Sequence, residues 1–195
     1  MKLYIDIDDV IVETTRTLAE TARAHYGKNI DFEDMTSFDL QRSLKLGPDE
    51  FEEFMSEVHE PAYLRELEPV ENAKETLIRW HDSGARLELV TGRPPHTRES
   101  TTGWLEDHSI PYDRLEFVDK YGRHKKEGLP RLEDLAGRSY DLAIEDSSRV
   151  ATYLAENTAS RVLLFDRPWN RDTKTDHGSM TRVFGWKEIW QEGHA

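Results

Sequence analysis

Acidic residues gather at one point near the start of the chain, where Asp6, Asp8 and Asp9 follow the apolar residues 3–5. Like charges this close repel and raise one another's pKa, so such a cluster usually accompanies a divalent cation that neutralises it. Asp6 and Asp8 are two residues apart, so an extended strand directs both side chains to the same face. This spacing suits a nucleophile beside a proton shuttle. An acidic turn exposed to solvent is the alternative, because the chain has 39 acidic and 26 basic residues.

A second pair of carboxylates, Glu145 and Asp146, follows the apolar residues 140–144. Asp146 or Ser147 could simply cap a following helix, which is a frequent reason for such residues at that position. Carboxylates at the ends of two parallel strands nevertheless form an oxygen-rich site that suits Mg²⁺. We therefore expect Mg²⁺ as cofactor, with Asp6 and Asp8 on one strand and Glu145 and Asp146 on the other.

A hydroxyl and a glycine end another apolar stretch, at Thr91 and Gly92. Thr91 would offer its hydroxyl and a nearby backbone N–H to phosphoryl oxygens, and Gly92 lets the backbone come close to them. Arg93 could pair with a phosphate in bidentate fashion. Each feature has an ordinary alternative, since Thr-Gly is common turn chemistry and Arg93 could be a surface residue.

A basic cluster comprises Lys120, His124, Lys125 and Lys126. Cations near a helix N-terminus are unfavourable for the helix dipole, so their presence suits an anion bound nearby. We expect Lys125 to be the active-site lysine, because it lies four residues before Leu129, the first core leucine of the helix expected there. Lys126 is a further substrate-binding candidate, and Lys120 remains an alternative. A charge run exposed to solvent would also explain the cluster.

Apolar strands that alternate with helices would bring these residues together. After the first strand, the apolar stretches that predict strands are residues 86–90, 114–118, 140–144 and 161–165. Each gap between these four holds a helix-length segment, including a leucine stripe over residues 129–135. This alternation predicts an α/β protein with a Rossmann-like parallel sheet of about five strands and helices on both faces. Ligands bind at the carboxyl ends of such strands, where the candidate residues lie.

The long interval over residues 15–70 contains helical patterns but no convincing strand. We expect a helical cap there, inserted into a core domain of residues 1–14 and 71–195; an ordinary crossover with extra helices is the alternative. Phe51 and Phe54 have the spacing of a helix that packs on its neighbour. Phe38 lies where the periodicity is weaker, so it is the better candidate to stack on a nucleobase.

Composition excludes several classes of protein. The chain has 195 residues and no cysteine, so disulfides and thiolate chemistry are excluded. A formal net charge of −13 argues against general binding to nucleic-acid backbones. The eight histidines show no spacing typical of a zinc site. No apolar run reaches membrane-spanning length and the N-terminus lacks a signal-peptide pattern, so we expect a cytoplasmic protein that makes no membrane contact.

The order of Asp6-x-Asp8-x-Val10, then Thr91, a lysine and Glu145 with Asp146 resembles the motifs of the haloacid dehalogenase superfamily of phosphohydrolases. The resemblance covers nearly the whole chain. Within that superfamily the chain is similar to the 5′(3′)-deoxyribonucleotidases and their bacterial relatives, because of the compact cap and residues 164–170.

The resemblance implies a mechanism. Asp6 would attack the phosphoryl group and form an aspartyl-phosphate, and Asp8 would protonate the leaving group and then activate water. Mg²⁺ would be held by Asp6, the backbone carbonyl of Asp8 and Asp146, with Glu145 acting through water. Thr91 and Lys125 would hold the phosphoryl oxygens.

The implied function is a Mg²⁺-dependent phosphomonoesterase that acts on a small phosphorylated substrate, most simply a nucleoside monophosphate, as a monomer or homodimer. Residues 91–94 are also similar to phage polynucleotide kinase 3′-phosphatase domains, so nucleic-acid ends are an alternative substrate, as are sugar phosphates. A non-catalytic phosphate-binding protein is a further alternative. Asp8 favours catalysis, because a binding protein needs no acid two residues after the nucleophile.

Overall fold

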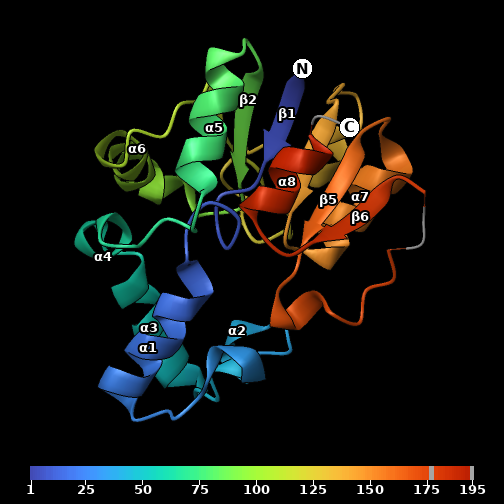
Figure 1. Cartoon of the computed structure of the whole chain (residues 1–195). Helices are drawn as coiled ribbons and strands as arrows, with labels where there is room; N and C mark the ends of the chain where they lie inside the picture. Colours follow the sequence, from blue (N-terminus) through green and yellow to red (C-terminus); the bar gives the residue numbers. More distant parts are fainter. Residues whose placement is uncertain (176–177, 194–195) are drawn as a thin grey trace.

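A six-stranded sheet forms the centre of the molecule in this computed structural model, which describes residues 1–175 and 178–193 (Figure 1). All strand pairs are parallel, in the order β3-β2-β1-β4-β5-β6. The strands are β1 (Lys2–Ile5), β2 (Arg86–Thr91), β3 (Arg114–Phe117), β4 (Leu142–Glu145), β5 (Arg161–Phe165) and β6 (Met180–Val183). The predicted α/β fold with a parallel sheet is confirmed.

The central strand β1 places the first carboxylates at the middle of the sheet. Ile5 pairs with Leu89 of β2 on one side and with Ile144 of β4 on the other. The carboxyl ends of these three strands therefore lie side by side. Because the strands are parallel, the polar residues that follow them share one edge of the sheet.

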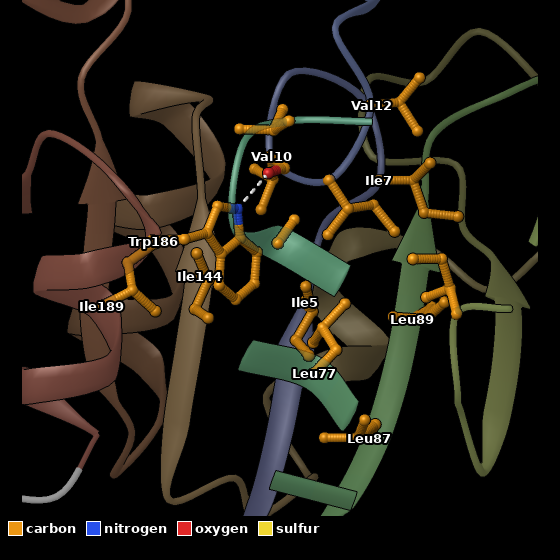
Figure 2. Close-up of a cluster of buried hydrophobic side chains, with 14 of the residues drawn as sticks. Ile5, Ile7, Val10, Val12, Leu77, Leu87, Leu89, Ile144, Trp186 and Ile189 are labelled. Atoms are coloured by element: carbon orange, nitrogen blue, oxygen red, sulfur yellow. Dashed lines mark hydrogen bonds between the residues drawn. The ribbon is translucent and has the colours of Figure 1, made fainter. Parts of the chain in front are cut away.

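Helices cover both faces of the sheet, as the burial of the strands requires. On one face lie α5 (Ala73–Asp82), α6 (Arg98–Asp107) and α8 (Trp186–Glu192), whose apolar side chains form a cluster with Ile5 and Leu89. Figure 2 shows part of this cluster, in which the Trp186 indole donates a hydrogen bond to the Val10 carbonyl at 2.8 Å. On the other face, α7 (Ser148–Asn157) packs on Tyr4 and Val90.

A helical segment, residues 14–65, connects β1 to the remainder of the core and lies beyond the carboxyl ends of the strands (Figure 1). Its elements are α1 (Thr14–Tyr26), η1 (Phe32–Asp34), α2 (Leu40–Ser43), α3 (Pro48–Val58) and α4 (Pro61–Arg65). Leu18, Met35 and Phe54 belong to a buried cluster of its own, distinct from the two clusters that flank the sheet. The division into a core domain and a cap of residues 15–70 stays a prediction.

Two elements differ from the sequence expectations. The sixth strand, β6, was not predicted, because its central residues Thr181 and Arg182 are polar and the strand lies at the sheet edge. The helix expected over residues 129–135 is only a short 3₁₀ helix, η3 (Leu132–Leu135). Pro130 and the left-handed Gly128, with φ 66°, oppose helix formation before Leu132. The basic cluster therefore lies in an irregular connection and not at the start of a helix.

Candidate active site

A tight turn after β1 presents the first carboxylates. Asp6 is bound to the sheet through its backbone N–H, which donates to the Ile144 carbonyl at 3.0 Å. The next residues curl back, so that the Ile7 carbonyl accepts hydrogen bonds from the backbone N–H groups of residues 10–12. Asp9 takes a left-handed conformation with φ 57°, and its carboxylate accepts the N–H and hydroxyl of Thr15 at the start of α1. This turn orients Asp6 and Asp8 while Asp9 holds the helix.

Three buried carboxylates meet at the ends of β1 and β4. Oxygens of Asp6, Glu145 and Asp146 all lie within 4.8 Å of one another. Burial, and then the charge of Glu145, raises the pKa of Asp6 to about 7. Burial, and then Asp6 and Glu145, likewise raises the pKa of Asp146. Such a set of hard oxygen ligands with excess negative charge fits a divalent cation such as Mg²⁺.

The lysine that contacts this cluster is Lys120, whereas Lys125, the lysine expected from the sequence, lies away from it. Lys120 Nζ lies 2.9 Å from Asp6 Oδ1 and 2.6 Å from Glu145 Oε1, and its side chain is fully buried. Lys125 and Lys126 are exposed and are not among the described residues that line the pocket. The strand-end rule that identified Thr91 and Glu145, applied to the third strand, would have favoured Lys120.

Glu145 is held by three donors. Its Oε1 accepts the Lys120 ammonium and the Tyr4 hydroxyl, each at 2.6 Å, and its Oε2 accepts the Ser147 N–H at 3.2 Å. Burial alone would lower the pKa of Lys120, but Asp6 and Glu145 outweigh burial and raise it. Glu145 therefore keeps Lys120 charged and directed at Asp6.

The Arg93 guanidinium binds the Asp8 carboxylate. It is therefore not available as an independent ligand for a phosphate. Its Nε lies 3.0 Å from both carboxylate oxygens and its Nη2 lies 2.7 Å from Oδ1. Thr14 also donates to Asp8 at 2.6 Å, and Thr101 accepts from Arg93 at 3.1 Å. Burial raises the pKa of Asp8, but Arg93 and Thr14 outweigh this effect and lower it. Sequence reasoning missed this pairing, because nothing local to Arg93 indicates where its long side chain ends.

Thr91 and Gly92 lie where the strand-end argument placed them. Thr91 is fully buried and its Oγ1 accepts the Arg93 N–H at 3.0 Å. A Cβ on Gly92 would lie 3.1 Å from the Tyr121 ring, so this position has little room for a side chain. The backbone of residue 92 lies so close to the Tyr121 ring that glycine is the residue that fits there.

A pocket of about 300 Å³ joins this site to the helical segment. Its floor includes Asp6, Asp8 and Asp146. Its apolar wall, which comes from the helical segment, includes Leu18, Phe38, Leu40, Met55, Val58, Tyr63 and Leu64. Phe38 is 39% exposed and its ring centroid lies 5.2 Å from that of Tyr121. The pocket thus combines an acidic floor with an apolar wall.

Other pocket residues were not identified from the sequence. Tyr121, His59 and Trp169 line the pocket, although they come from three different parts of the chain. Trp169 donates a hydrogen bond to Asp146 Oδ2 at 2.9 Å. Trp169 belongs to residues 164–170, which carry the family resemblance, but no motif indicates that it or the other two residues line the pocket. Among the described helices, none has the length and apolar character needed to cross a bilayer.

Comparison with known proteins gives a consistent result. The family described as 5′ nucleotidase, deoxy (pyrimidine), cytosolic type C protein matches residues 1–192. A protein of Halalkalibacterium halodurans that carries the provisional name of a nucleotidase is 28% identical over 184 residues, covering 94% of this chain and 88% of its own. A similarly named protein of Bacillus subtilis is 28% identical over 191 residues, covering 98% of this chain and 92% of its own.

Solved structures share the fold at low sequence identity. A conserved haloacid dehalogenase-like protein from Agrobacterium tumefaciens has a TM-score of 0.68 at 15% identity, covering 99% of this chain and 97% of its own. A haloacid dehalogenase-family hydrolase from Deinococcus radiodurans, determined with bound phosphate and sodium, has a TM-score of 0.65 at 16% identity, covering 96% of this chain and 92% of its own. These structures show that the fold is the one seen in haloacid dehalogenase-like proteins. With the family match over nearly its whole length, the chain belongs to the cytosolic type C 5′ nucleotidase family.

Proposed function

We propose that this phosphatase is a Mg²⁺-dependent 5′-nucleotidase that works through an aspartyl-phosphate on Asp6. The observation that carries the proposal is the buried group of Asp6, Glu145 and Asp146 with Lys120 in contact with two of them. Asp6, Asp146 and the backbone carbonyl of Asp8 would hold Mg²⁺. The cation would neutralise charge on the phosphoryl group and on the carboxylates.

The reaction divides into two displacements. In the first, a carboxylate oxygen of Asp6 bonds to phosphorus while the bond from phosphorus to the leaving oxygen breaks. Asp8 gives its proton to that oxygen. In the second, Asp8 takes a proton from water, the water oxygen bonds to phosphorus, and the bond to Asp6 breaks. Asp6 is regenerated and phosphate is released.

Asp8 must leave part of its pairing with Arg93 to act as an acid. Arg93 favours the charged form of Asp8, which suits the second displacement, where a carboxylate takes a proton from water. For the first displacement Asp8 needs a proton, and substrate negative charge near Asp8 raises the affinity for that proton. Arg93 would thus hold the Asp8 carboxylate through its full pairing in the second displacement and through the remaining part of that pairing in the first.

Lys120 and Thr91 would stabilise the transferred group. The Lys120 ammonium lies beside the nucleophile, where it can counter negative charge on the phosphoryl oxygens and prevent repulsion of the substrate by Asp6. Thr91 ends the strand next to β1, so its hydroxyl lies on the same edge of the sheet. Phosphoryl transfer asks mainly for such positioning and charge neutralisation.

The apolar wall of the pocket supports a nucleoside as the leaving group. Phe38 and Tyr121 offer aromatic faces on which a base can stack, an interaction of roughly 1–3 kcal/mol per base. The relatives that bear the name of nucleotidase agree with this substrate class. Sugar phosphates have no flat apolar group to use this wall.

Phosphate release from a substrate panel tests the proposal. The panel contains deoxyribonucleoside and ribonucleoside 5′-monophosphates, sugar phosphates and a 3′-phosphorylated oligonucleotide, each with Mg²⁺ and with a chelator. We expect Mg²⁺-dependent release from nucleoside monophosphates and none from Asp6→Asn. Release from the oligonucleotide alone would assign the activity to nucleic-acid ends. Parent-like turnover by Asp6→Asn would contradict the mechanism, and binding of phosphate without release from any compound would indicate a binding protein.

A further inference from the structure

The loop after β5 contacts the acidic site from the side. It contains Arg167 and the short helix η4 (Pro168–Asn170). Asn170 is fully buried, and its amide donates to the backbone carbonyls of Asp146 at 2.8 Å and Phe165 at 2.7 Å. Arg167 donates to the Asp9 carbonyl at 2.8 Å. These bonds fix the loop to the ends of β1, β4 and β5, so the two residues between Arg167 and Asn170, Pro168 and Trp169, are placed with little freedom.

That intervening stretch directs Trp169 at a proposed metal ligand. The indole Nε1 donates to Asp146 Oδ2 at 2.9 Å. Indole nitrogen is a donor only, so this bond requires an accepting oxygen and restricts rotation of the carboxylate. Within the described part of the chain, Trp169 is the side chain that donates to this carboxylate, whereas Glu145 has two such donors. The orientation of Asp146 therefore depends on one residue.

The other side of Trp169 meets the helical segment. Phe32 of η1 lies edge-on to the indole, with ring centroids 5.8 Å apart and an interplanar angle of 83°. The Arg16 guanidinium lies over the Phe32 ring, 4.3 Å from its centroid. Farther along the same loop, Arg171 forms ion pairs with Glu33 at 2.6 Å and with Asp166 at 3.1 Å. The same loop thus touches both the acidic site and the helical segment.

We propose that Trp169 is a positioning residue that orients Asp146 for the divalent cation, and that its contact with Phe32 couples the placement of the helical segment to metal affinity. This inference rests on the proposed function, because it takes Asp146 as a metal ligand. Residues that hydrogen-bond a metal ligand set its orientation, and their loss typically weakens metal binding by about 10–100-fold. Coupling is reciprocal, so a bound cation also stabilises the contact between Phe32 and Trp169.

Calorimetric titration of the purified full chain with Mg²⁺ measures metal affinity directly. It tests separately the positioning role of Trp169 and the coupling through Phe32. Trp169→Phe keeps an aromatic ring but removes the N–H, and we expect Mg²⁺ to bind about tenfold more weakly. Phe32→Ala leaves the N–H in place, and we expect binding about threefold weaker through the loss of coupling. Trp190→Phe makes the same chemical change on α8 and should bind as the parent does.

The outcomes are distinguishable from failure of the proposed function. Parent affinity in Trp169→Phe overturns the positioning role, and parent affinity in Phe32→Ala overturns the coupling. Thermal melting without metal checks that each variant folds; if Trp169→Phe does not fold, the titration of Phe32→Ala decides. A parent that hydrolyses nucleotides and binds Mg²⁺ while Trp169→Phe is unaffected contradicts this inference alone. A parent that binds no divalent cation contradicts the proposed function.

Discussion

Lys120 has no access to solvent, and its ammonium lies between two carboxylates that also border Asp146. One positive charge does not balance three carboxylates in a buried site. The remaining negative charge explains why burial and mutual repulsion raise the pKa of Asp6 and of Asp146. At the scale of single residues, the site therefore has a fixed cation that belongs to the chain and an excess of carboxylates that a second cation would neutralise.

Substitution of each lysine in turn should show whether Lys120 or Lys125 acts in catalysis. We expect Lys120→Met to lower kcat at saturating Mg²⁺ by a factor on the order of 10²–10³, which is the usual effect of losing one electrostatic donor. Lys125→Met should retain the parent kcat, because Lys125 is exposed. Steady-state phosphate release measures both, and circular dichroism checks folding. A loss of activity in Lys125→Met with an active Lys120→Met would reverse the assignment.

His59 should make stability depend on pH. Burial, and then the charge of His96, lower its pKa to about 4; Arg93 and His124 act in the same direction, whereas Asp8 opposes them. In the unfolded chain a histidine has a pKa near about 6.5, so the unfolded state binds more protons between these values. The contribution of neutral His59 to the free energy of unfolding is therefore full above about pH 6.5 and decreases as pH falls toward 4.

His59→Gln removes this titration while it keeps a polar side chain. Urea unfolding at about pH 7.5 and about pH 5 should show a smaller loss of stability for the variant than for the parent. His81→Gln, at an exposed position, serves as the matched control and should lose as much as the parent. An identical loss in parent and His59→Gln would show that burial of His59 has no such effect.

At the scale of elements, the helical segment has an apolar cluster of its own. Phe54 of α3 is fully buried there, and Phe51 on the same helix is only partly buried. Because α3 also supplies Met55 and Val58 to the pocket wall, the packing of this helix positions residues that face the substrate. Stability of the segment and substrate binding should therefore change together.

Truncation of the two phenylalanines tests this connection. We expect Phe54→Ala to lower the free energy of unfolding by about 3–5 kcal/mol, the usual range for a buried aromatic, and to raise KM. Phe51→Ala deletes the same atoms at a partly exposed site and should cost clearly less. Urea unfolding and steady-state kinetics measure the two effects. Equal losses in both variants would contradict the difference in burial.

The elements also show where periodicity succeeds and fails. The buried central strands have nearly continuous apolar runs, so their positions follow from the sequence. The edge strand β6 lacks such a run because only Met180 and Val183 face the core. The leucines of residues 129–135 have apolar spacing but no regular helix before Leu132, because Pro130 cannot supply a backbone N–H. Local pattern is thus reliable where burial is complete and unreliable at edges and connections.

At the scale of the whole molecule, Mg²⁺ should stabilise the folded chain. The unfolded chain does not hold its carboxylates together, so a cation that binds only the folded state adds about 2.7 kcal/mol at a hundred times its Kd. For a domain of this size that corresponds to a rise in Tm of roughly 5–10 °C. Thermal melting with Mg²⁺ and with a chelator measures the shift.

Two controls show whether the acidic site is responsible. Asp146→Asn should lose most of the rise in Tm, because it removes one of the three clustered carboxylates. NaCl at equal ionic strength should not reproduce the rise, although it screens the repulsion expected from a formal net charge of −13. The same rise with NaCl, or in Asp146→Asn, would assign the stabilisation to general screening.

Strand-end chemistry could be located from the sequence alone. Asp6, Thr91 and Glu145 follow apolar runs directly, and parallel pairing necessarily brings such residues to one edge of the sheet. The position of Gly92 could also be predicted from the sequence, since the backbone must turn sharply where the strand ends. These positions depend on the backbone, whose course is set by local hydrophobic pattern.

The partners of long side chains were decided only by the tertiary structure. Lys120 and Lys125 are close in sequence, yet one is buried against Asp6 and the other is exposed. Arg93 extends to Asp8, and Trp169 reaches Asp146 from a loop more than 20 residues later in the chain. A long side chain can end in many places around its Cα, and packing among elements distant in sequence selects one of them.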